Sequence, residues 1–204
     1  PASDGRVDPE LLKEIVRHAM PAGAPTDMRL LDRGLLLAGD LPGAIVTGGL
    51  AAGTREGRSD LVLLSRSKPL WSGSLSVDNS GSRSTGEARA LASVSLASPQ
   101  GWGEQFSADI LKSEGARYGR FGFGFPVGYE GSRLSLGVSR MDYELVSADY
   151  VAARLAGQST SWNAEYVRPL ARSRVFNVNF TAGLDAKGFH NTAATTVISD
   201  YGLR

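Results

Sequence analysis

The stretch Phe176 to Leu184, FNVNFTAGL, carries an apolar side chain at every second position and a polar or small residue between them. Successive side chains of a β-strand point to opposite faces of the sheet, so this period of two predicts a strand with one apolar and one polar face. The same alternation recurs in segments 71–77, 88–96, 105–110, 120–127, 134–138 and 160–166, and an eighth strand is predicted to begin near Thr195. The chain from residue 70 onward therefore reads as antiparallel β-structure.

The residues before this region have a helical period instead. Asp8 is a good N-cap for a helix whose apolar face is expected to end near Met20. A second amphipathic helix is expected to start at Thr26 or Asp27 and to stop within Gly39 to Gly43, where proline and glycine cannot continue it. The sequence thus predicts two consecutive helices.

Two β-like runs follow these helices, Ala44 to Ala52 and Asp60 to Ser67, and the glycine-rich segment Gly53 to Arg58 is expected to be the turn between them. From residue 70 onward, apolar residues recur at every second position. We therefore expect an α+β module over residues 1–69 and a separate β-region over residues 70–204.

Composition argues against several functional classes. The formal net charge is +1 with no basic stripe, so we expect no nucleic-acid partner. The absence of cysteine removes thiolate metal sites and cysteine nucleophiles. The two histidines, His18 and His190, fall in different predicted elements, which leaves no candidate metal site or catalytic triad. We expect neither an enzyme nor a cofactor-binding protein.

The alternating strands fit either a membrane barrel or a soluble β-sandwich, because both have one apolar face per strand. Strand length favours the barrel, since several segments approach the ~9–11 residues that cross a bilayer at a tilt. The longest connection, Leu145 to Gly157, falls on the extracellular side if the chain enters from the periplasm. Aromatic residues also gather near strand ends, where their rings suit a lipid–water boundary. A soluble β-sandwich binding module remains the alternative.

Five segments resemble a known family in their order along the chain. Leu31 to Gly43 (LDRGLLLAGDLPG), with the two β-like runs, resembles the last periplasmic POTRA module of two-partner secretion transporters. The other four are similar to the first strands, turns and loops of that family's barrel: Val77 to Gly86 (VDNSGSRSTG), Phe125 to Arg133 (FPVGYEGSR), Tyr166 to Arg174 (YVRPLARSR) and Gly183 to His190 (GLDAKGFH). The resemblance covers nearly the whole chain.

This resemblance implies an outer-membrane translocation channel of a Gram-negative bacterium. A POTRA module in the periplasm would recognise an exoprotein, such as an adhesin, haemolysin or contact-inhibition toxin, and the β-barrel, surrounded by outer-membrane lipid, would secrete it. A BamA-like assembly factor for outer-membrane proteins shares the architecture and is the nearest alternative.

The sequence departs from the family pattern in three ways. The first strand of a β-α-α-β-β POTRA module is expected to be missing. The family barrel has on the order of sixteen strands, against seven or eight here, so a partial barrel is expected. The family's Val-Arg-Gly-Tyr pore-loop motif would lie beyond Arg204.

Two candidate sites follow. An exposed edge in the first β-like run would capture an extended exoprotein segment by β-augmentation, and it comprises Ala44, Ile45, Val46, Thr47 and Leu50. Charged residues assigned to polar strand faces would line a wet lumen, and these are Asp109, Arg120, Arg140, Asp142 and Glu165. The alternatives are a half-buried strand for the first site and a solvated sandwich exterior for the second.

Overall fold

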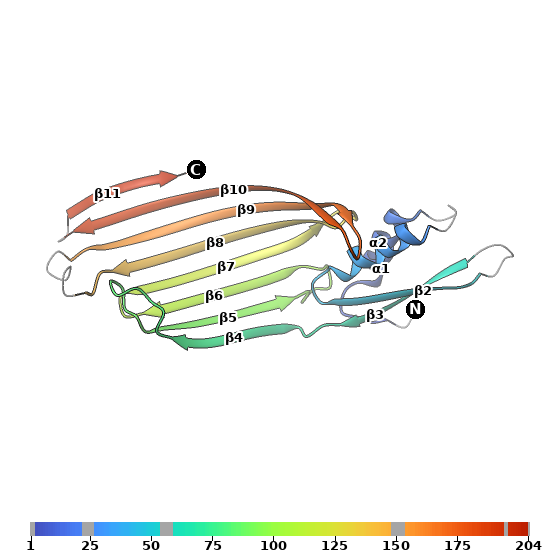
Figure 1. Ribbon diagram of the computed structural model, residues 1–204, viewed down its shortest axis with the longest axis horizontal. Helices are drawn as coiled ribbons and strands as arrows, with labels where there is room; N and C mark the ends of the chain where they lie inside the picture. Colours follow the sequence, from blue (N-terminus) through green and yellow to red (C-terminus); the bar gives the residue numbers. More distant parts are fainter. Residues whose placement is uncertain (1–2, 22–26, 54–58, 148–153, 194–195, 204) are drawn as a thin grey trace.

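The computed structural model describes residues 3–21, 27–53, 59–147, 154–193 and 196–203, which form two sheets and two helices (Figure 1). Parts of the predicted Gly53 to Arg58 turn and of the Leu145 to Gly157 connection lie outside these residues, as does Thr195. The N-terminal elements are β1 (Ser3–Asp4), α1 (Pro9–Ala19), α2 (Met28–Gly39), β2 (Ala44–Ala52) and β3 (Ser59–Ser67). The remaining strands are β4 (Trp71–Asp78), β5 (Arg89–Ala97), β6 (Gln105–Ser113), β7 (Ala116–Val127), β8 (Ser132–Glu144), β9 (Ala156–Arg172), β10 (Asn177–Ala193) and β11 (Thr196–Leu203).

The elements from β1 to β3 make a small α/β unit, which we call the N-terminal module. Asp8 caps α1 as predicted, because its side chain accepts a hydrogen bond from the backbone N–H of Glu10 at 2.9 Å. The two helices pack on one face of a three-stranded sheet of order β1-β3-β2. The apolar sides of the helices and sheet form the core, which contains Val7, Leu12, Ile15, Val16, Leu31, Leu37, Ala38, Leu41 and Ala44.

The prediction that the first strand of this module is missing is wrong in part. Ser3 and Asp4 form the short strand β1, which pairs in parallel with Ser65 and Arg66 of β3. Two polar residues give no hydrophobic periodicity, so the sequence carries no signal for this strand. The described module therefore has the order β-α-α-β-β.

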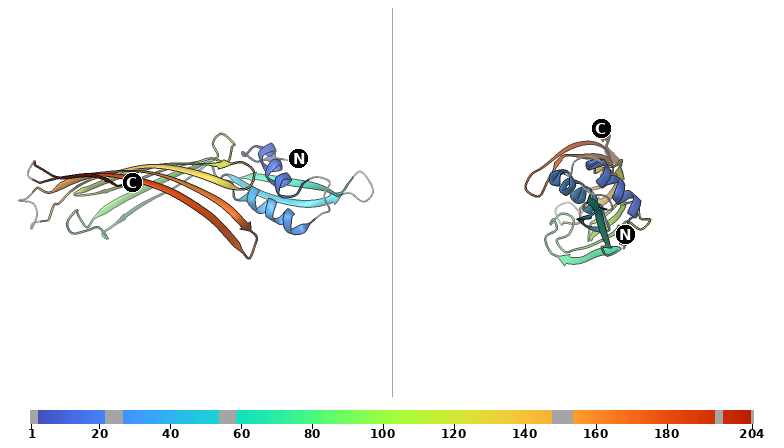
Figure 2. Two further views of the ribbon diagram at one scale, coloured as in Figure 1. Left: turned by 90° about the horizontal axis from the view of Figure 1, so that it is seen from above. Right: turned by 90° about the vertical axis from the view of Figure 1, so that its right-hand side faces the viewer.

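The strands β4 to β11 form one eight-stranded antiparallel sheet in which each strand pairs with its neighbours in sequence. These strands match the eight predicted from the period of two. Figure 2 shows that the sheet is strongly curved, with the N-terminal module at one end. The connections 98–104, 128–131 and 173–176 lie at this module end, and those after β4, β6 and β8 lie at the far end (Figure 1). The described strands do not form the two packed sheets of a β-sandwich.

One face of this sheet is apolar yet exposed, and we call it the apolar face. Cross-strand pairing aligns Ala108, Phe121, Val138, Trp162 and Ala186 in one row across β6 to β10. Trp162 is 62% exposed and Leu184, one row away, is 78% exposed. A continuous exposed apolar surface of this kind marks contact with a partner or with lipid. None of the described helices is long and apolar enough to span a bilayer.

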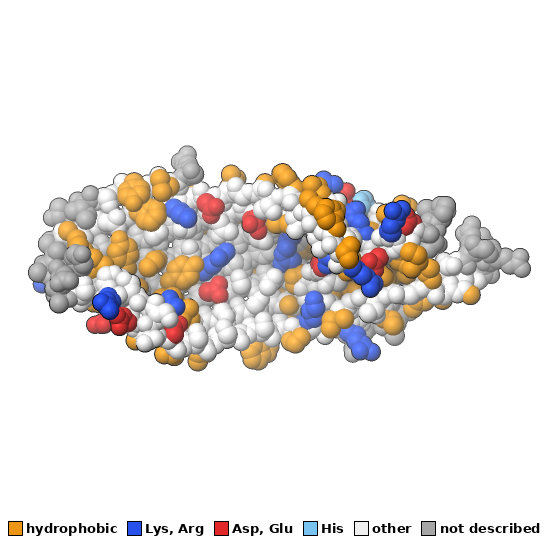
Figure 3. Space-filling view, in the orientation of Figure 1, with side chains coloured by type: hydrophobic (Ala, Val, Ile, Leu, Met, Phe, Trp, Pro, Cys, Tyr) orange, Lys and Arg blue, Asp and Glu red, His pale blue; other side chains and the backbone are white. Residues whose placement is uncertain are grey.

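The opposite face, which we call the polar face, consists mainly of serine, glycine, asparagine and charged residues. Figure 3 looks onto it and shows lysine, arginine, aspartate and glutamate side chains gathered along the middle of the sheet. Ser74 and Ser93 hydrogen-bond across β4 and β5 at 2.9 Å, and the next row pairs Ser95 with Ser107. The curved sheet therefore separates two surfaces of opposite chemistry.

Candidate functional site

Three of the five predicted lumen residues lie together on the polar face. Asp109 on β6 stands directly opposite Arg120 on β7. Arg120 and Glu165 of β9 line one hollow of about 290 Å³, which also contains Ser107 and Asn163. The hollow thus has both signs of charge on a mainly polar floor.

Gly122 and Gly124, at alternate positions of β7, keep this hollow open. A Cβ atom at Gly122 would lie 2.6 Å from the hydroxyl oxygen of Ser107, and one at Gly124 would lie 2.8 Å from a guanidinium nitrogen of Arg133. Both distances are shorter than real Cβ contacts allow, so side chains from neighbouring strands occupy the space above these glycines. The side chains of Ser107 and Arg133 can therefore lie close to the backbone of β7 without filling the hollow.

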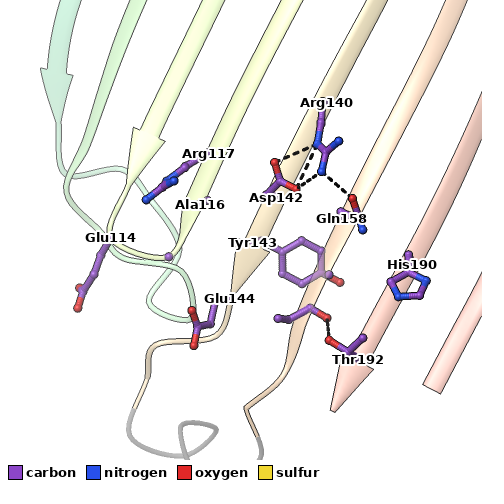
Figure 4. A pocket seen from close by; sticks show the side chains of 13 residues that line it. Glu114, Ala116, Arg117, Arg140, Asp142, Tyr143, Glu144, Gln158, His190 and Thr192 are labelled. Carbon is purple, nitrogen blue, oxygen red and sulfur yellow. Dashed lines mark hydrogen bonds and ion pairs between the residues drawn. The ribbon is translucent and has the colours of Figure 1, made fainter. Parts of the chain in front are cut away.

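The other two predicted lumen residues, Arg140 and Asp142, lie on the opposite face. Pairing between β7 and β8 is continuous from Val127↔Ser132 to Ala116↔Tyr143, so the even-numbered residues of β8 all share the face of Val138. The prediction that they lie on the polar face is wrong, because it follows from their charge and ignores their even residue numbers, which place them on the face of Val138. Figure 4 shows Arg140 beside Asp142 and Gln158, in a hollow of about 600 Å³ near the far end of the sheet.

The predicted partner-binding strand β2 lies at the edge of its sheet. In the order β1-β3-β2, one side of β2 pairs with β3 and no described strand pairs with the other side. Lys68 N donates to Gly43 O at 2.9 Å, which makes the odd-numbered β2 residues the hydrogen-bonded partners of β3. The backbone groups of Val46 and Leu50 consequently point to the free edge, whereas the N–H of Ala44 on the same side donates to Leu41 O at 3.3 Å.

The side chains of this strand divide between the two faces of the small sheet. Val46 packs against the core beneath the helices. Ile45 and Thr47 lie on the bare face, where Ile45 is 47% exposed and Thr47 is exposed. Leu64, directly opposite Thr47 on β3, is also exposed. The predicted residues therefore offer a free backbone edge next to a small exposed apolar patch.

The N-terminal module is fixed to the sheet by two arginine–aspartate pairs that the sequence did not reveal. Arg172 at the end of β9 donates to both carboxylate oxygens of Asp40, at 2.7 and 2.8 Å. Arg174, in the next connection, holds Asp32 of α2 with a shortest distance of 2.7 Å. The carboxylate of Asp32 raises the pKa of Arg174 through this hydrogen bond and its charge. Two bidentate pairs from one hairpin fix both position and orientation.

A second fixed contact comes from the connection between β5 and β6, which is organised by the buried carboxylate of Glu104. This carboxylate accepts hydrogen bonds from the backbone N–H groups of Gln100 at 2.5 Å and Trp102 at 2.8 Å. The hydroxyl of Ser98 accepts one from Gly103 N at 2.9 Å. Because Glu104 is only 2% exposed, these bonds supply the hydrogen-bond partners that its buried oxygens require.

The ordered connection then contacts the N-terminal module. Asp8 N donates to Gly101 O at 2.8 Å, and the Arg6 side chain donates to Ala97 O at 3.0 Å. Gly43 has a φ of +85°, and a Cβ there would lie 2.9 Å from Ser98 Cβ. The only sequence signal for this contact was an acidic residue inside a glycine-rich turn.

Solved structures share this architecture. The chain superimposes on CdiB from Escherichia coli with a TM-score of 0.76 and 22% identity, covering 98% of this chain and 39% of that one. For CdiB from Acinetobacter baumannii the values are 0.72 and 20%, covering 96% and 38%. BamA from Haemophilus ducreyi, lacking POTRA domains 1–3, gives 0.55 and 10%, covering 93% and 43%. The fold is therefore that of the BamA-like barrel-type proteins.

Sequence comparison identifies the family within that class. Residues 57–200 match the model of the haemolysin secretion/activation protein family ShlB/FhaC/HecB, and the chain belongs to this family of two-partner secretion transporters. A relative is the heme/hemopexin transporter protein HuxB of Haemophilus influenzae, 24% identical over 151 residues, which cover 73% of this chain and 26% of HuxB. The chain spans about a quarter of the length of this relative.

Proposed function

We propose that this chain is part of an outer-membrane channel that secretes an exoprotein. The observation that supports this most directly is the curved sheet with an exposed apolar face on one side and a charged polar face on the other. In a bilayer the apolar face would contact lipid and the polar face would line a water-filled lumen. Family membership favours secretion over other barrel functions.

In this proposal the N-terminal module is a POTRA module in the periplasm. Its β-α-α-β-β order and its position at one end of the sheet support this assignment. Residues 1–69 would then be the periplasmic module and residues 70–204 the barrel region, with the module end of the sheet facing the periplasm and the far end facing outward.

The exoprotein would bind first to the free edge of β2. An extended segment could add as a further strand, because Val46 and Leu50 direct backbone donors and acceptors outward. The exposed side chain of Ile45 would contribute an apolar contact beside that strand. This mode recognises an unfolded chain through its backbone and so tolerates many sequences.

The captured segment would then pass along the polar face. Asp109, Arg120 and Glu165 would interact with a hydrated polypeptide of either charge, because the two signs stand on adjacent strands. Charged side chains of both signs, surrounded by glycine and serine, favour weak and reversible contacts over a tight binding site. Such a surface suits the transit of an adhesin, haemolysin or toxin.

Deletion of the gene tests the function. The exoprotein encoded beside it should accumulate in the periplasm and disappear from the medium, while other outer-membrane barrels assemble normally. Loss of those barrels instead would assign the chain to BamA-like assembly, and unchanged secretion would contradict the proposal.

The variant Leu50→Pro tests β2 capture. Proline removes an N–H that points to the free edge while leaving the β2–β3 ladder intact, and such positions tolerate proline. Leu50→Ala truncates the same side chain but keeps the N–H, which makes it the matched control. We expect crosslinking between β2 and the exoprotein to fall only for Leu50→Pro. Equal crosslinking for both variants would refute backbone capture.

A further inference from the structure

The two faces of the large sheet exchange their chemistry near its far end. On the apolar face, the row after Ile110 is polar from β6 to β11, with residues paired directly from strand to strand: Lys112, Arg117, Asp142, Gln158, His190 and Asp200; on β5 and β4 the row continues as the apolar Ala90 and Val77. On the other face the adjacent row is mainly apolar from β5 to β11, with Leu91, Leu111, Tyr118, Met141, Phe189 and Tyr201; Ser159 interrupts it, and on β4 it ends with Ser76. Phe189 and Tyr201 stack there with ring centroids 5.2 Å apart.

This exchange coincides with the expected height of a membrane boundary. From Val127 to Arg117, β7 rises roughly 33 Å, which at a tilt of ~40° corresponds to a height of about 25 Å. That height equals the apolar band of an outer-membrane barrel, about 25 Å. If Val127 marks the inner boundary, Arg117 lies at the outer one.

The polar row holds two cations, Lys112 and Arg117, and two carboxylates, Asp142 and Asp200, and each carboxylate interacts with a residue other than these cations. Arg140, one row nearer the centre, donates to Asp142 at 3.1 Å, and His190 lies 3.7 Å from Asp200. Lys112 and Arg117 form no ion pair with any described residue, although they stand directly opposite each other on adjacent strands. Like charges at directly opposed positions destabilise a sheet unless a counter-charge offsets them.

Asp142 stands directly opposite Arg117, but its carboxylate accepts from Arg140 instead, and no described carboxylate forms an ion pair with Lys112 or Arg117. Glu114 and Glu144 line the same hollow, but Figure 4 shows both side chains directed toward the connections and away from Arg117. The dashed lines in that view join Arg140 with Asp142 and Gln158, and Thr192 with Ala156, and none reaches Arg117. Two neighbouring cations thus face outward at the end of the apolar band.

We propose that Lys112 and Arg117 bind the phosphate groups of a phosphorylated glycolipid in the outer leaflet, whose acyl chains cover the apolar rows beneath. This inference rests on the proposed function, because it requires the apolar face to contact a membrane. The guanidinium of Arg117 matches phosphate oxygens in charge and donor geometry, and the ammonium of Lys112 adds a compact point charge beside it. The continuous surface from Phe121 to Arg117 supplies contacts for both the acyl chains and the head group.

The test uses the full-length transporter in phosphatidylcholine vesicles containing lipid A with both phosphates or lipid A with none. Native mass spectrometry of the protein released from the vesicles measures the bound lipid. A further experiment adds inorganic phosphate as a competitor. The test variant is Lys112→Gln/Arg117→Gln. Arg83→Gln is the matched control, because Arg83 is a highly exposed cation at the same end of the sheet, in the β4–β5 connection.

The wild type and Arg83→Gln should retain bisphosphorylated lipid A at least about tenfold better than the dephosphorylated form, and the double variant should lose this preference. Equal retention of both forms by the wild type would overturn the inference, as would an unchanged preference in the double variant. Competition by millimolar inorganic phosphate alone would indicate a free-anion site and would also overturn it.

Membrane insertion is measured in parallel by heat-dependent electrophoretic mobility. Failure of the wild type to insert would refute the proposed function itself, whereas normal insertion with no lipid preference would refute only this inference.

Discussion

The carboxylate of Glu104 is expected to hold the N-terminal module against the sheet, and the variant Glu104→Ala tests this. The substitution removes the acceptor for Gln100 N and Trp102 N, which lie 2.5 and 2.8 Å from its oxygens. An unsatisfied buried donor costs about 1–3 kcal/mol, and water can partly reach both donors, so we expect a total near 2–4 kcal/mol. At 1.36 kcal/mol per factor of ten, local opening should increase by roughly 30- to 900-fold.

Hydrogen exchange followed by mass spectrometry measures this opening. The peptide that spans residues 98–105 should exchange faster by the stated factor, and the amide of Asp8 should follow, because it donates to Gly101 O in the same connection. Gln100→Ala is the control, since its exposed side chain is lost while its backbone N–H remains. The reasoning fails if Glu104→Ala changes exchange less than about threefold, or if Asp8 stays protected while the connection opens.

Two further predictions concern the junction and the faces of the sheet. In a double-mutant cycle of Asp40→Ala and Arg172→Ala, the coupling in the urea unfolding of the N-terminal module should be about 0.5–1 kcal/mol, and additive effects would show that the pair is not coupled. Because the sequence lacks cysteine, single-cysteine variants are unambiguous: a membrane-impermeant charged thiol reagent should modify Arg120→Cys but not Phe121→Cys in vesicles, and equal rates would refute the assignment of faces.

The alternating segments predicted the strands well but underestimated their length. The segment 134–138 lies inside β8, and the segment 160–166 lies inside β9, which spans Ala156–Arg172. The parts missing at the far end are those where the apolar and polar positions exchange, because a search for one continuous alternation stops at that level; residues 167–172 of β9, at the module end, were missed as well. The helices were easier, since their caps and apolar faces are local signals.

The contacts between the module and the sheet could not be predicted from local patterns. Arg172 and Asp40 are separated by 132 positions, and their pairing depends on where the whole sheet places the end of β9. Glu104 was missed for a different reason: its partners are backbone N–H groups, which every residue carries. Only the turn geometry, including a φ of +53° at Ser98, brings them to one carboxylate.

The error at Arg140 and Asp142 has a physical explanation that applies to membrane barrels in general. A charged residue on a strand satisfies its charge either by facing water inside the barrel or by lying beyond the apolar band on the outside. In our proposal Asp109 and Arg120 use the first arrangement and Asp142 uses the second, while Arg140, one row inside the boundary, donates to Asp142 and Gln158 at that boundary. Charge alone cannot distinguish these two arrangements. In a strand whose pairing register is unbroken, the odd or even number of a residue does distinguish them, because it fixes the face whatever the residue type. Counting residues along each strand from the most apolar row therefore gives the face on which each charged residue lies and its distance from the middle of the apolar band. This count identifies Lys112 and Arg117.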